Sequence, residues 1–311
     1  MNETISINVT NLKKYYGPIK AVDGLSFTVK AGSIFGMLGP NGAGKTTTIE
    51  MIVGLTKRSA GEINILGYSL DQDWEAIKKI IGVQLQSPNL FPRLTVSEIL
   101  KLFSRFYPQP LQVKTVLHRI GLENKAKEWV KNLSGGQQRR LAIGLAMIGD
   151  PKILFLDEPT TGLDPQSRRQ LWEVIESLRD EGKTVFLTTH YMEKAERLCD
   201  DLVIINQGKL IAQDSPGNLI NEFFGESAIE FAVSRLTPAQ KGQLEMRFQK
   251  NKIRTHPAKN KIILYSQDIS TSIREILDFT GQNGMWIEDI SIRQASLEDV
   301  FLKLTGRGFT A

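Results

Sequence analysis

A short apolar strand that runs into a glycine-rich loop most constrains what this chain can fold into. Ile34–Leu38 is apolar, and Gly39–Thr46 then matches the pattern G-x-x-x-x-G-K-[ST]. Glycine lets backbone N–H groups approach a phosphate closely, and the N-terminus of a following helix adds a favourable partial charge. The pattern predicts a phosphate-binding loop in which Lys45 reaches the β- and γ-phosphates and the Thr46 hydroxyl holds Mg²⁺. The nucleotide-binding candidates in this loop are Gly39, Pro40, Asn41, Gly42, Ala43, Gly44, Lys45, Thr46 and Thr47.

The first two thirds of the chain alternate short apolar runs with helical patterns. Further runs lie at Ile153–Leu156, Thr184–Thr188 and Leu202–Asn206. Helices between such runs favour a parallel sheet with helices on its faces, which is an α/β fold. The segments Ser6–Leu12 and Leu25–Val29 are more typical of antiparallel strands beside that sheet.

A helical subdomain is expected inside this α/β core, at about residues 88–150. The strand signal disappears there, and Thr95-Val96-Ser97-Glu98 is a capping box that opens a helix through about Tyr107. Another helix is expected to end near Gly121.

A second domain is expected from residue 226 to 311, after a nucleotide-binding domain of residues 1–221. The order of its expected elements is strand, helix, strand, strand, helix, strand, which is the ferredoxin-like α+β arrangement. Thr237–Gln240 supplies a capping box with proline in the first turn. A last helix is expected to start at Ser296 and to end before Gly306. The expected strands are Ala228–Val233, Lys252–Thr255, Ile262–Ser266 and Trp286–Ile292.

Two adjacent acids, Asp157 and Glu158, follow the apolar run Ile153–Leu156. The first acid at the end of such a strand can hold Mg²⁺, and the second can polarise an attacking water. Taken alone, the pair is equally typical of solvated acids at the end of a buried strand. Its place after a phosphate loop favours the catalytic interpretation.

The stretch Leu133-Ser134-Gly135-Gly136-Gln137 is identical to the signature sequence of the ABC ATPases, and the residues that follow it also resemble that family. The resemblance covers about residues 5–220, and it implies that Ser134 begins a helix. A Ser-Gly-Gly helix start is also an anion site on physical grounds, although it can equally be a capped helix and nothing more. The resemblance adds Ser134, Gly135, Gly136 and Gln137 to the nucleotide-binding candidates.

The family's other motifs follow in the same order as in its members. Gln86 resembles the glutamine of the glutamine loop, although Leu85 stands before it where relatives often carry proline. Asp164, in Thr161–Pro165, resembles the acid of the D-loop and also reads as a helix cap before an N1 proline. His190 resembles the switch histidine.

Tyr16, before Gly17, resembles the aromatic residue that stacks on adenine. Tyr15 is adjacent, however, and aromatic residues more often fill cores or surfaces. By this resemblance the catalytic candidates are Lys45, Gln86, Glu158 and His190, and the metal candidates are Thr46, Gln86 and Asp157.

The resemblance implies an ATPase that uses ATP and Mg²⁺ and works as a head-to-tail dimer, expected to pair identical chains. Each ATP would lie between the phosphate loop of one chain and Ser134, Gly135, Gly136 and Asp164 of the other. Substrate would pass through separate membrane-spanning permease subunits, which would contact the chain near residues 87–107. The implied location is cytoplasmic and peripheral, on the inner face of the cell membrane.

The tail Ser296–Gly306 resembles the end of ATPases from the drug- and antibiotic-export class, although Val300, Phe301 and Leu304 can also form one face of an amphipathic helix. Importer ATPases and soluble ABC ATPases remain the alternatives. A ribosome-acting member would usually carry two cassettes, and a DNA-repair member a long coiled coil. A module that only senses nucleotide would lack an acid at Glu158.

Composition narrows the partners further. The formal net charge is +5, and because no dense basic run accompanies it, we expect a solvated surface and no nucleic-acid partner. Cys199 is the only cysteine of the sequence, so no internal disulfide is possible, which agrees with a reducing compartment. No apolar stretch approaches the roughly 20 residues that span a bilayer, and Met1–Thr4 shows no start of a secretory signal.

Overall fold

The structure is a computed structural model whose chain divides into two compact units, Met1–Pro216 and Gly217–Thr310. The predicted boundary between residues 221 and 226 lies a few residues beyond this division. Each unit is described by itself. The structure describes residues 4–86, 90–224, 227–233, 236–248, 252–256 and 261–305, without the side chains of 252–256.

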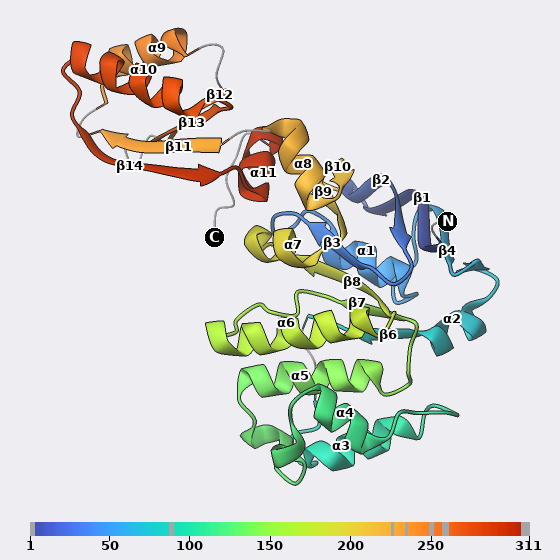
Figure 1. Ribbon diagram of the computed structural model, residues 1–311. Coiled ribbons are helices and arrows are strands. Elements are labelled where there is room, and N and C mark those ends of the chain that lie inside the picture. The colour runs from blue at the N-terminus through green and yellow to red at the C-terminus, as the bar shows by residue number, and fades with distance from the viewer. Residues whose placement is uncertain are drawn as a thin grey trace. The chain divides into compact units, whose positions relative to one another are not determined.

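The main sheet of the first unit contains β3 (Ile34–Leu38) near its centre (Figure 1). Within the described residues it has six strands in the order β10-β9-β3-β8-β7-β6. All neighbouring pairs are parallel except β9 and β10. The other strands are β6 (Ile81–Gln84), β7 (Ile153–Leu156), β8 (Thr184–Thr189), β9 (Asp201–Asn206) and β10 (Lys209–Asp214). The predicted parallel sheet is confirmed, whereas β10 was not predicted.

An antiparallel sheet accompanies the parallel one, as the sequence predicts. Its described strands follow the order β2-β1-β4-β5. They are β1 (Ile5–Tyr16), β2 (Ile19–Lys30), β4 (Ala60–Ile65) and β5 (Tyr68–Ser69). The sequence analysis missed β4, which contains Gly61, and β5, which has two residues.

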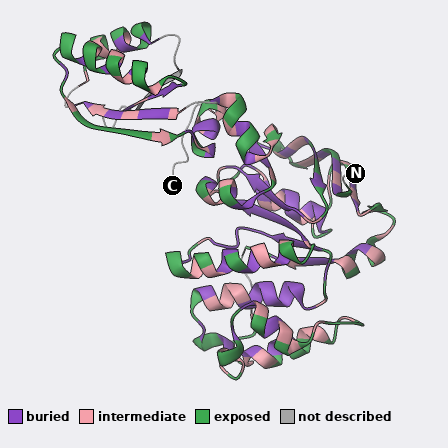
Figure 2. Ribbon diagram, in the orientation of Figure 1, coloured by how far each residue is buried: buried purple, intermediate pink, exposed green. Residues whose placement is uncertain are grey.

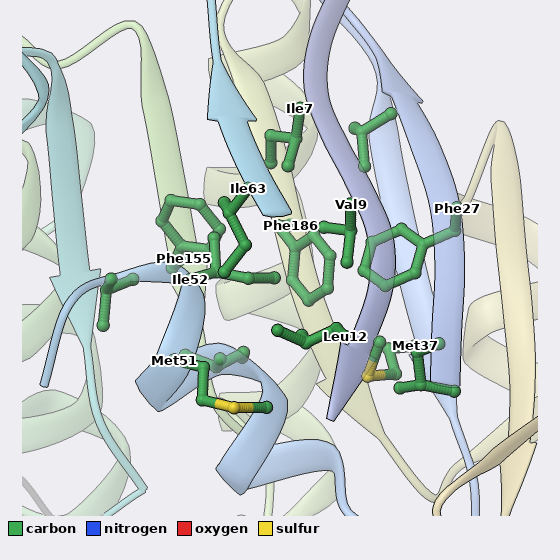
Figure 3. Close-up of a cluster of buried hydrophobic side chains, with 14 of the residues drawn as sticks. Ile7, Val9, Leu12, Phe27, Met37, Met51, Ile52, Ile63, Phe155 and Phe186 are labelled. Carbon is green, nitrogen blue, oxygen red and sulfur yellow. The ribbon is translucent and has the colours of Figure 1, made fainter. Parts of the chain in front are cut away.

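A single aromatic cluster joins the strands of both sheets (Figure 3). The ring of Phe35 on β3 lies 5.7 Å from that of Phe27 on β2 and 5.3 Å from that of Phe186 on β8, centroid to centroid. Met51 and Ile52 reach the same cluster from α1 (Lys45–Ile52). This packing fixes β3 and α1, and therefore the loop between them.

The helices of the first unit alternate with the parallel strands. Besides α1 they are α2 (Trp74–Ile80), α3 (Val96–Ser104), α4 (Val113–Arg119), α5 (Gly135–Met147), α6 (Pro165–Asp180) and α7 (Met192–Leu198), with 3₁₀ turns η1 (Glu123–Lys125) and η2 (Val130–Asn132). α8 (Pro216–Phe223) crosses the division between the units.

The helical subdomain contains α3, α4 and α5. The capping box that opens α3 is present, because Thr95 Oγ1 accepts a hydrogen bond from the N–H of Glu98 and the Glu98 carboxylate accepts one from the N–H of Thr95. The predicted end of α3 at Tyr107 is wrong, since the helix ends at Ser104. Pro108 accounts for this, because a proline disfavours helical backbone in the residue before it.

The second unit has the predicted ferredoxin-like order, in which β11 (Ser227–Val233) lies inside a fully antiparallel sheet. Its described strands follow the order β12-β13-β11-β14. Buried Ile229, Phe231 and Leu264 pack with Leu244 and Ile276 of the helices. The other elements are β12 (Lys252–His256), β13 (Lys261–Ser266), β14 (Ile287–Gln294), α9 (Pro238–Arg247), α10 (Ile269–Gln282) and α11 (Leu297–Thr305).

Among the helices of the described residues, none is long and apolar enough to cross a membrane.

Candidate nucleotide site

The glycine-rich loop leaves the end of β3 and turns into α1 at Lys45. Gly44 stands at the N-cap of α1 with φ 103°, a left-handed conformation that glycine adopts without steric cost. A side chain at Gly39 would meet the carbonyl oxygen of Ile205 at 2.4 Å, so that position also requires glycine. The Lys45 side chain is 5% exposed, and its Nζ donates to the carbonyl oxygens of Gly39 at 2.8 Å and Pro40 at 3.2 Å.

Asp157 follows β7 and faces the loop. Its Oδ2 accepts a hydrogen bond from Thr46 Oγ1 at 2.9 Å, and its Oδ1 accepts one from Thr188 Oγ1 at 2.5 Å. A buried carboxylate beside a threonine hydroxyl is the oxygen donor set that Mg²⁺ prefers in nucleotide sites. The two residues therefore fit the predicted metal.

Glu158 has an unusual backbone conformation for an acidic residue, with φ 44°. Such strain persists only where the surroundings fix it, and it is common at functional sites. Here the N–H of Glu158 donates to Thr188 Oγ1 at 2.9 Å, and the same hydroxyl donates to Asp157. The turn places the Glu158 carboxylate against Lys45, with Oε1 3.2 Å from Nζ.

The other oxygen of the Glu158 carboxylate is held by two neighbours. Oε2 accepts a hydrogen bond from Thr161 Oγ1 at 2.8 Å and lies 3.1 Å from Nδ1 of His190. Burial acts to raise the pKa of Glu158, but the Thr161 hydrogen bond and the charges of Lys45 and His190 outweigh it and hold that pKa below its usual range. The carboxylate is therefore ionised at neutral pH.

The structure thus brings Lys45, Thr46, Asp157, Glu158 and His190 into one contiguous cluster. The sequence analysis missed Thr188 and Thr161, which hold the two acids. The signal for Thr188 was a threonine on the strand that pairs with β7, and many strands carry one. Thr161 begins the D-loop stretch Thr161–Pro165, but nothing in the sequence indicated a role of its own.

Gln86 lies two residues beyond the end of β6 and is exposed. Its carbonyl oxygen accepts a hydrogen bond from Arg139 Nη1 of α5. In the described part of the chain no hydrogen bond joins Gln86 to Lys45 or Glu158, so its catalytic and metal roles stay predictions. Arg139 was not among the predicted residues.

The signature residues begin α5, as the resemblance implies. Ser134 is the N-cap and forms a capping box with Gln137, because Ser134 Oγ accepts from the N–H of Gln137 at 3.3 Å and Gln137 Oε1 accepts from the N–H of Ser134 at 2.9 Å. Ser134 and Gly135 are exposed. A side chain at Gly136 would meet Ser167 Oγ of α6 at 2.3 Å, so this glycine allows α5 and α6 to approach.

Asp164 caps α6, with Oδ1 accepting from the backbone N–H groups of Gln166 at 3.0 Å and Ser167 at 2.9 Å. The predicted cap before an N1 proline is therefore confirmed. The part of Asp164 in a shared nucleotide site stays a prediction.

The two adjacent tyrosines differ in their contacts. The Tyr15 hydroxyl donates to Asp23 at 2.7 Å, and this hydrogen bond raises the pKa of Tyr15. Tyr16 is 47% exposed, and Lys14 Nζ lies 4.7 Å from its ring centroid. Tyr15 is 36% exposed, so both rings are accessible, and the stacking of Tyr16 on adenine stays a prediction.

Comparisons with known proteins agree on one family. Residues 22–161 match the family model described as ABC transporter. The chain is 40% identical to the Nod factor export ATP-binding protein I of Ralstonia nicotianae, over 99% of this chain and 96% of that protein. It is 35% identical to the linearmycin resistance ATP-binding protein LnrL of Bacillus subtilis, over 97% and 98% of the two chains.

Solved structures agree as well. A bacterial ABC transporter cassette solved as a dimer superposes with a TM-score of 0.61 at 30% identity, covering 67% of this chain and 98% of the cassette. The cbiO1 subunit of Clostridium perfringens gives a TM-score of 0.64 at 25% identity, covering 80% and 97%. Together with the phosphate loop, the paired acids and the signature helix, these findings show that the chain belongs to the ABC transporter ATP-binding proteins and is an ATP-hydrolysing subunit that powers transport.

Proposed function

We propose that the cluster around Lys45 binds ATP with Mg²⁺ and that Glu158 orients the attacking water. The observation that carries this proposal is the Glu158 carboxylate, ionised and fixed 3.2 Å from Lys45 Nζ. Thr46 and Asp157 would hold the metal, which when bound neutralises charge on the β- and γ-phosphates. His190, on Oε2 of Glu158, orients the carboxylate.

ATP entry requires an exchange of partners. Lys45 Nζ is satisfied by Glu158 and by the carbonyl oxygens of Gly39 and Pro40. The γ-phosphate takes the place of the Glu158 carboxylate on the ammonium group. The freed carboxylate can then accept a hydrogen bond from water. Because the carboxylate lies beside the ammonium group that now holds the γ-phosphate, this water lies next to the γ-phosphate.

The second half of the proposal is a head-to-tail dimer in which each ATP lies between two chains. The N-terminus of α5 supports it, because Ser134 and Gly135 are exposed and free backbone N–H groups at a helix start attract anions. Lys45 and Ser134 have no hydrogen bond to each other in the part of the chain that the structure describes. A second chain supplies the missing half of each site and gives two equivalent sites across a two-fold axis.

A mixing experiment tests the shared site. In a Glu158→Gln background, Lys45→Ala and Ser134→Arg are each expected to damage both sites and to abolish the increase in dimerisation that Mg-ATP causes. A mixture of the two variants contains heterodimers with one intact site, so it should dimerise better than either parent. Equal dimerisation of mixture and parents, measured by light scattering, contradicts the shared site. Normal dimerisation of Ser134→Arg alone contradicts it as well.

We further propose that membrane-spanning subunits dock in an apolar groove of about 380 Å³ in the first unit. The groove lies between the sheet and the helical subdomain. It includes Leu55, which is 60% exposed, and Leu85, which is 40% exposed and directly precedes Gln86. A partner in this groove would move Gln86 and, through the Arg139 contact, α5. The groove is lined by Val53, Leu55, Trp74, Lys78, Ile81, Val83, Leu85, Phe103, Tyr107, Leu145 and Ala146.

The names of the relatives, which are export and resistance proteins, support export as the direction of transport. Docking on a membrane-spanning subunit would place the chain on the inner face of the cell membrane.

Leu55→Glu should abolish co-purification with the membrane subunit and leave the ATPase activity of the isolated chain unchanged. Ile5→Glu is the matched control, because Ile5 is 49% exposed on β1, outside both the groove and residues 87–107. Co-purification of Leu55→Glu at the wild-type level would contradict the docking site.

A further inference from the structure

The strand β14 has one unpaired edge. It pairs antiparallel with β11 on one side, and no strand of the described residues pairs with its other side. Residues 288–292 are all exposed, and Figure 2 shows β14 largely in the colour of exposed residues. A free edge with exposed apolar side chains is a template for pairing with another strand. Ile290 is 39% exposed and Ile292 is 51% exposed.

From Asp289 to Gln294 the side chains of β14 alternate between the two faces of the sheet, whereas a register shift relative to β11 lies between Ile287 and Asp289. Ile290 lies opposite Phe231 and Ile292 opposite Ile229, and both of these partners belong to the core under the helices. The isoleucines therefore share the helix-covered face but extend beyond its cover. Asp289 lies on the other face, opposite Ala232.

We propose that β14 pairs antiparallel with β14 of a second copy of this chain, in a register centred on Ser291. A two-fold axis perpendicular to the sheet keeps the helices of both copies of the second unit on one face of the joined sheet. Such an axis must pass between the two copies of one residue. Centred on Ser291, the register places Ile290 opposite the partner's Ile292. On the other face it places Asp289 opposite the partner's Arg293.

This register is the one that matches both faces. Moving the centre to Ile290 would leave Asp289 opposite the partner's Ser291, and moving it to Ile292 would leave Asp289 opposite the partner's Ala295. Cross-strand pairs of apolar or opposite charge contribute roughly 0.2–1 kcal/mol each, and like charges destabilise. Charged residues usually protect an edge from self-pairing. Here Asp289 and Arg293 lie at equal distances from Ser291, so each faces the opposite charge of a second copy and the edge is complementary to itself.

Arg293 is already ordered for such a contact. Its Nη1 and Nη2 donate to Asp299 at 2.6 and 2.9 Å, and Asp299 is 2% exposed. Nη1 also donates to the carbonyl oxygen of Gln294 at 3.0 Å, and Nε lies 3.8 Å from Oε1 of Glu230. The guanidinium has five N–H donors, so the second N–H of Nη2 remains for a carboxylate across the edge. Because the side chain is held in place before association, less rotamer entropy is lost when the partner's Asp289 binds.

Pairing through β14 is independent of ATP, because the nucleotide-site candidates all lie in the first unit and β14 lies in the second. It would tether two chains after hydrolysis has released the nucleotide-dependent contact between them. A tethered pair re-forms its sites at an effective concentration set by the tether rather than by the bulk protein.

Disulfide trapping in the full chain without nucleotide tests the register. Ser291→Cys faces its own copy, and directly opposite residues of an antiparallel pair have Cα atoms about 4.5–5.5 Å apart, within disulfide range. Oxidation with diamide should therefore convert most of this variant to a covalent dimer. Glu288→Cys is the control, since the two copies of residue 288 lie six residues out of register, about 20 Å apart. Native Cys199 is buried and will not react.

A mixture of Ile290→Cys and Ile292→Cys supplies the complementary result, because these residues face each other in the proposed register and lie in the regular part of β14. It should yield the mixed covalent dimer on oxidation faster than either variant alone forms one, because the two copies of one of these residues lie two residues out of register. Absence of a Ser291→Cys dimer in protein that still binds ATP overturns the proposal. Trapping of Glu288→Cys with itself at the same rate as Ser291→Cys overturns the register.

A charge variant tests the association without a covalent bond. Asp289→Arg places like charges on both sides of the two-fold axis, so it should weaken nucleotide-free self-association about two- to thirtyfold in sedimentation. Asp278→Arg is the matched control, because Asp278 is exposed on α10 of the same unit and carries the same change of charge. Equal self-association of the two variants contradicts the pairing through β14.

Discussion

Replacing Glu158 by glutamine keeps the shape of the side chain but removes its charge and its capacity to accept a proton. In the structure the carboxylate is held by Lys45, Thr161 and His190, so the amide has hydrogen-bond partners and the local fold should persist. Assistance by a general base contributes typically about 10²–10⁴-fold to a rate. We expect kcat for ATP hydrolysis to fall by about that factor.

The same substitution should strengthen ATP binding. In the wild-type chain the γ-phosphate competes with the Glu158 carboxylate for the Lys45 ammonium group. A hydrogen bond to a charged group contributes about 1.5–3 kcal/mol, which corresponds to about 10–150-fold in affinity. The phosphate entering an open site is partly solvated, so the lower end, about tenfold tighter binding, is the expected value.

Phosphate release measures the rate, and calorimetry with Mg-ATP measures the affinity. Glu173→Gln is the control, because Glu173 is exposed on α6 and loses the same charge. Turnover within a few-fold of wild type would remove Glu158 from the base role. Unchanged or weaker ATP binding would show that Glu158 and phosphate do not compete for Lys45.

Three further outcomes are expected. Lys45→Ala should weaken ATP binding about ten- to hundredfold in calorimetry, because it removes a charge-assisted phosphate contact. Because the pKa of Glu158 in the nucleotide-free chain lies below its usual range, kcat/KM for ATP hydrolysis should not fall through titration of this group between pH 7 and 5. A fall of kcat/KM centred near pH 6 would contradict this. Burial raises the pKa of the Cys199 thiol, so iodoacetamide should leave it unmodified until the chain unfolds.

Much of the fold could be predicted because the motifs impose their own local structure. Ile34–Leu38 is a strand with the predicted bounds, and Ser134 and Asp164 cap helices because their side chains accept from backbone N–H groups two or three residues later. The capping boxes at Thr95 and Thr237 are present for the same reason. Each of these depends on residues close together in the sequence.

Contacts between distant segments could not be predicted. Thr188 joins Asp157 and Glu158 from a strand about thirty residues later, and Arg139 reaches the carbonyl of Gln86 across the helical subdomain. Nothing in the local pattern of Thr188 distinguishes it from an ordinary strand threonine. The proposed transfer of the Lys45 ammonium group from Glu158 to phosphate depends on such contacts. It can therefore be inferred from the folded structure but not from the sequence.

The structure confirms one of the two interpretations of the tail, the helix face. The sequence left Ser296–Gly306 as either a feature of export ATPases or one face of a helix. In the structure Val300 and Phe301 are buried, as a helix face requires, and Asp299 accepts hydrogen bonds from Tyr265, Arg293 and the N–H of Ser296.

Asp299 therefore ties α11 to two strands of the second unit. Burial acts to raise its pKa, but Arg293 and Tyr265 lower it, so the stabilisation is present at neutral pH and is lost as pH falls through the lowered value. Asp299→Ala leaves Arg293 without its main partner, and since Arg293 is partly exposed, we expect a loss of about 2–3 kcal/mol. Urea unfolding of the full chain should show this loss in the transition of the second unit. The variant should also weaken trapping of Ser291→Cys, because Arg293 then no longer holds the position that faces the partner's Asp289.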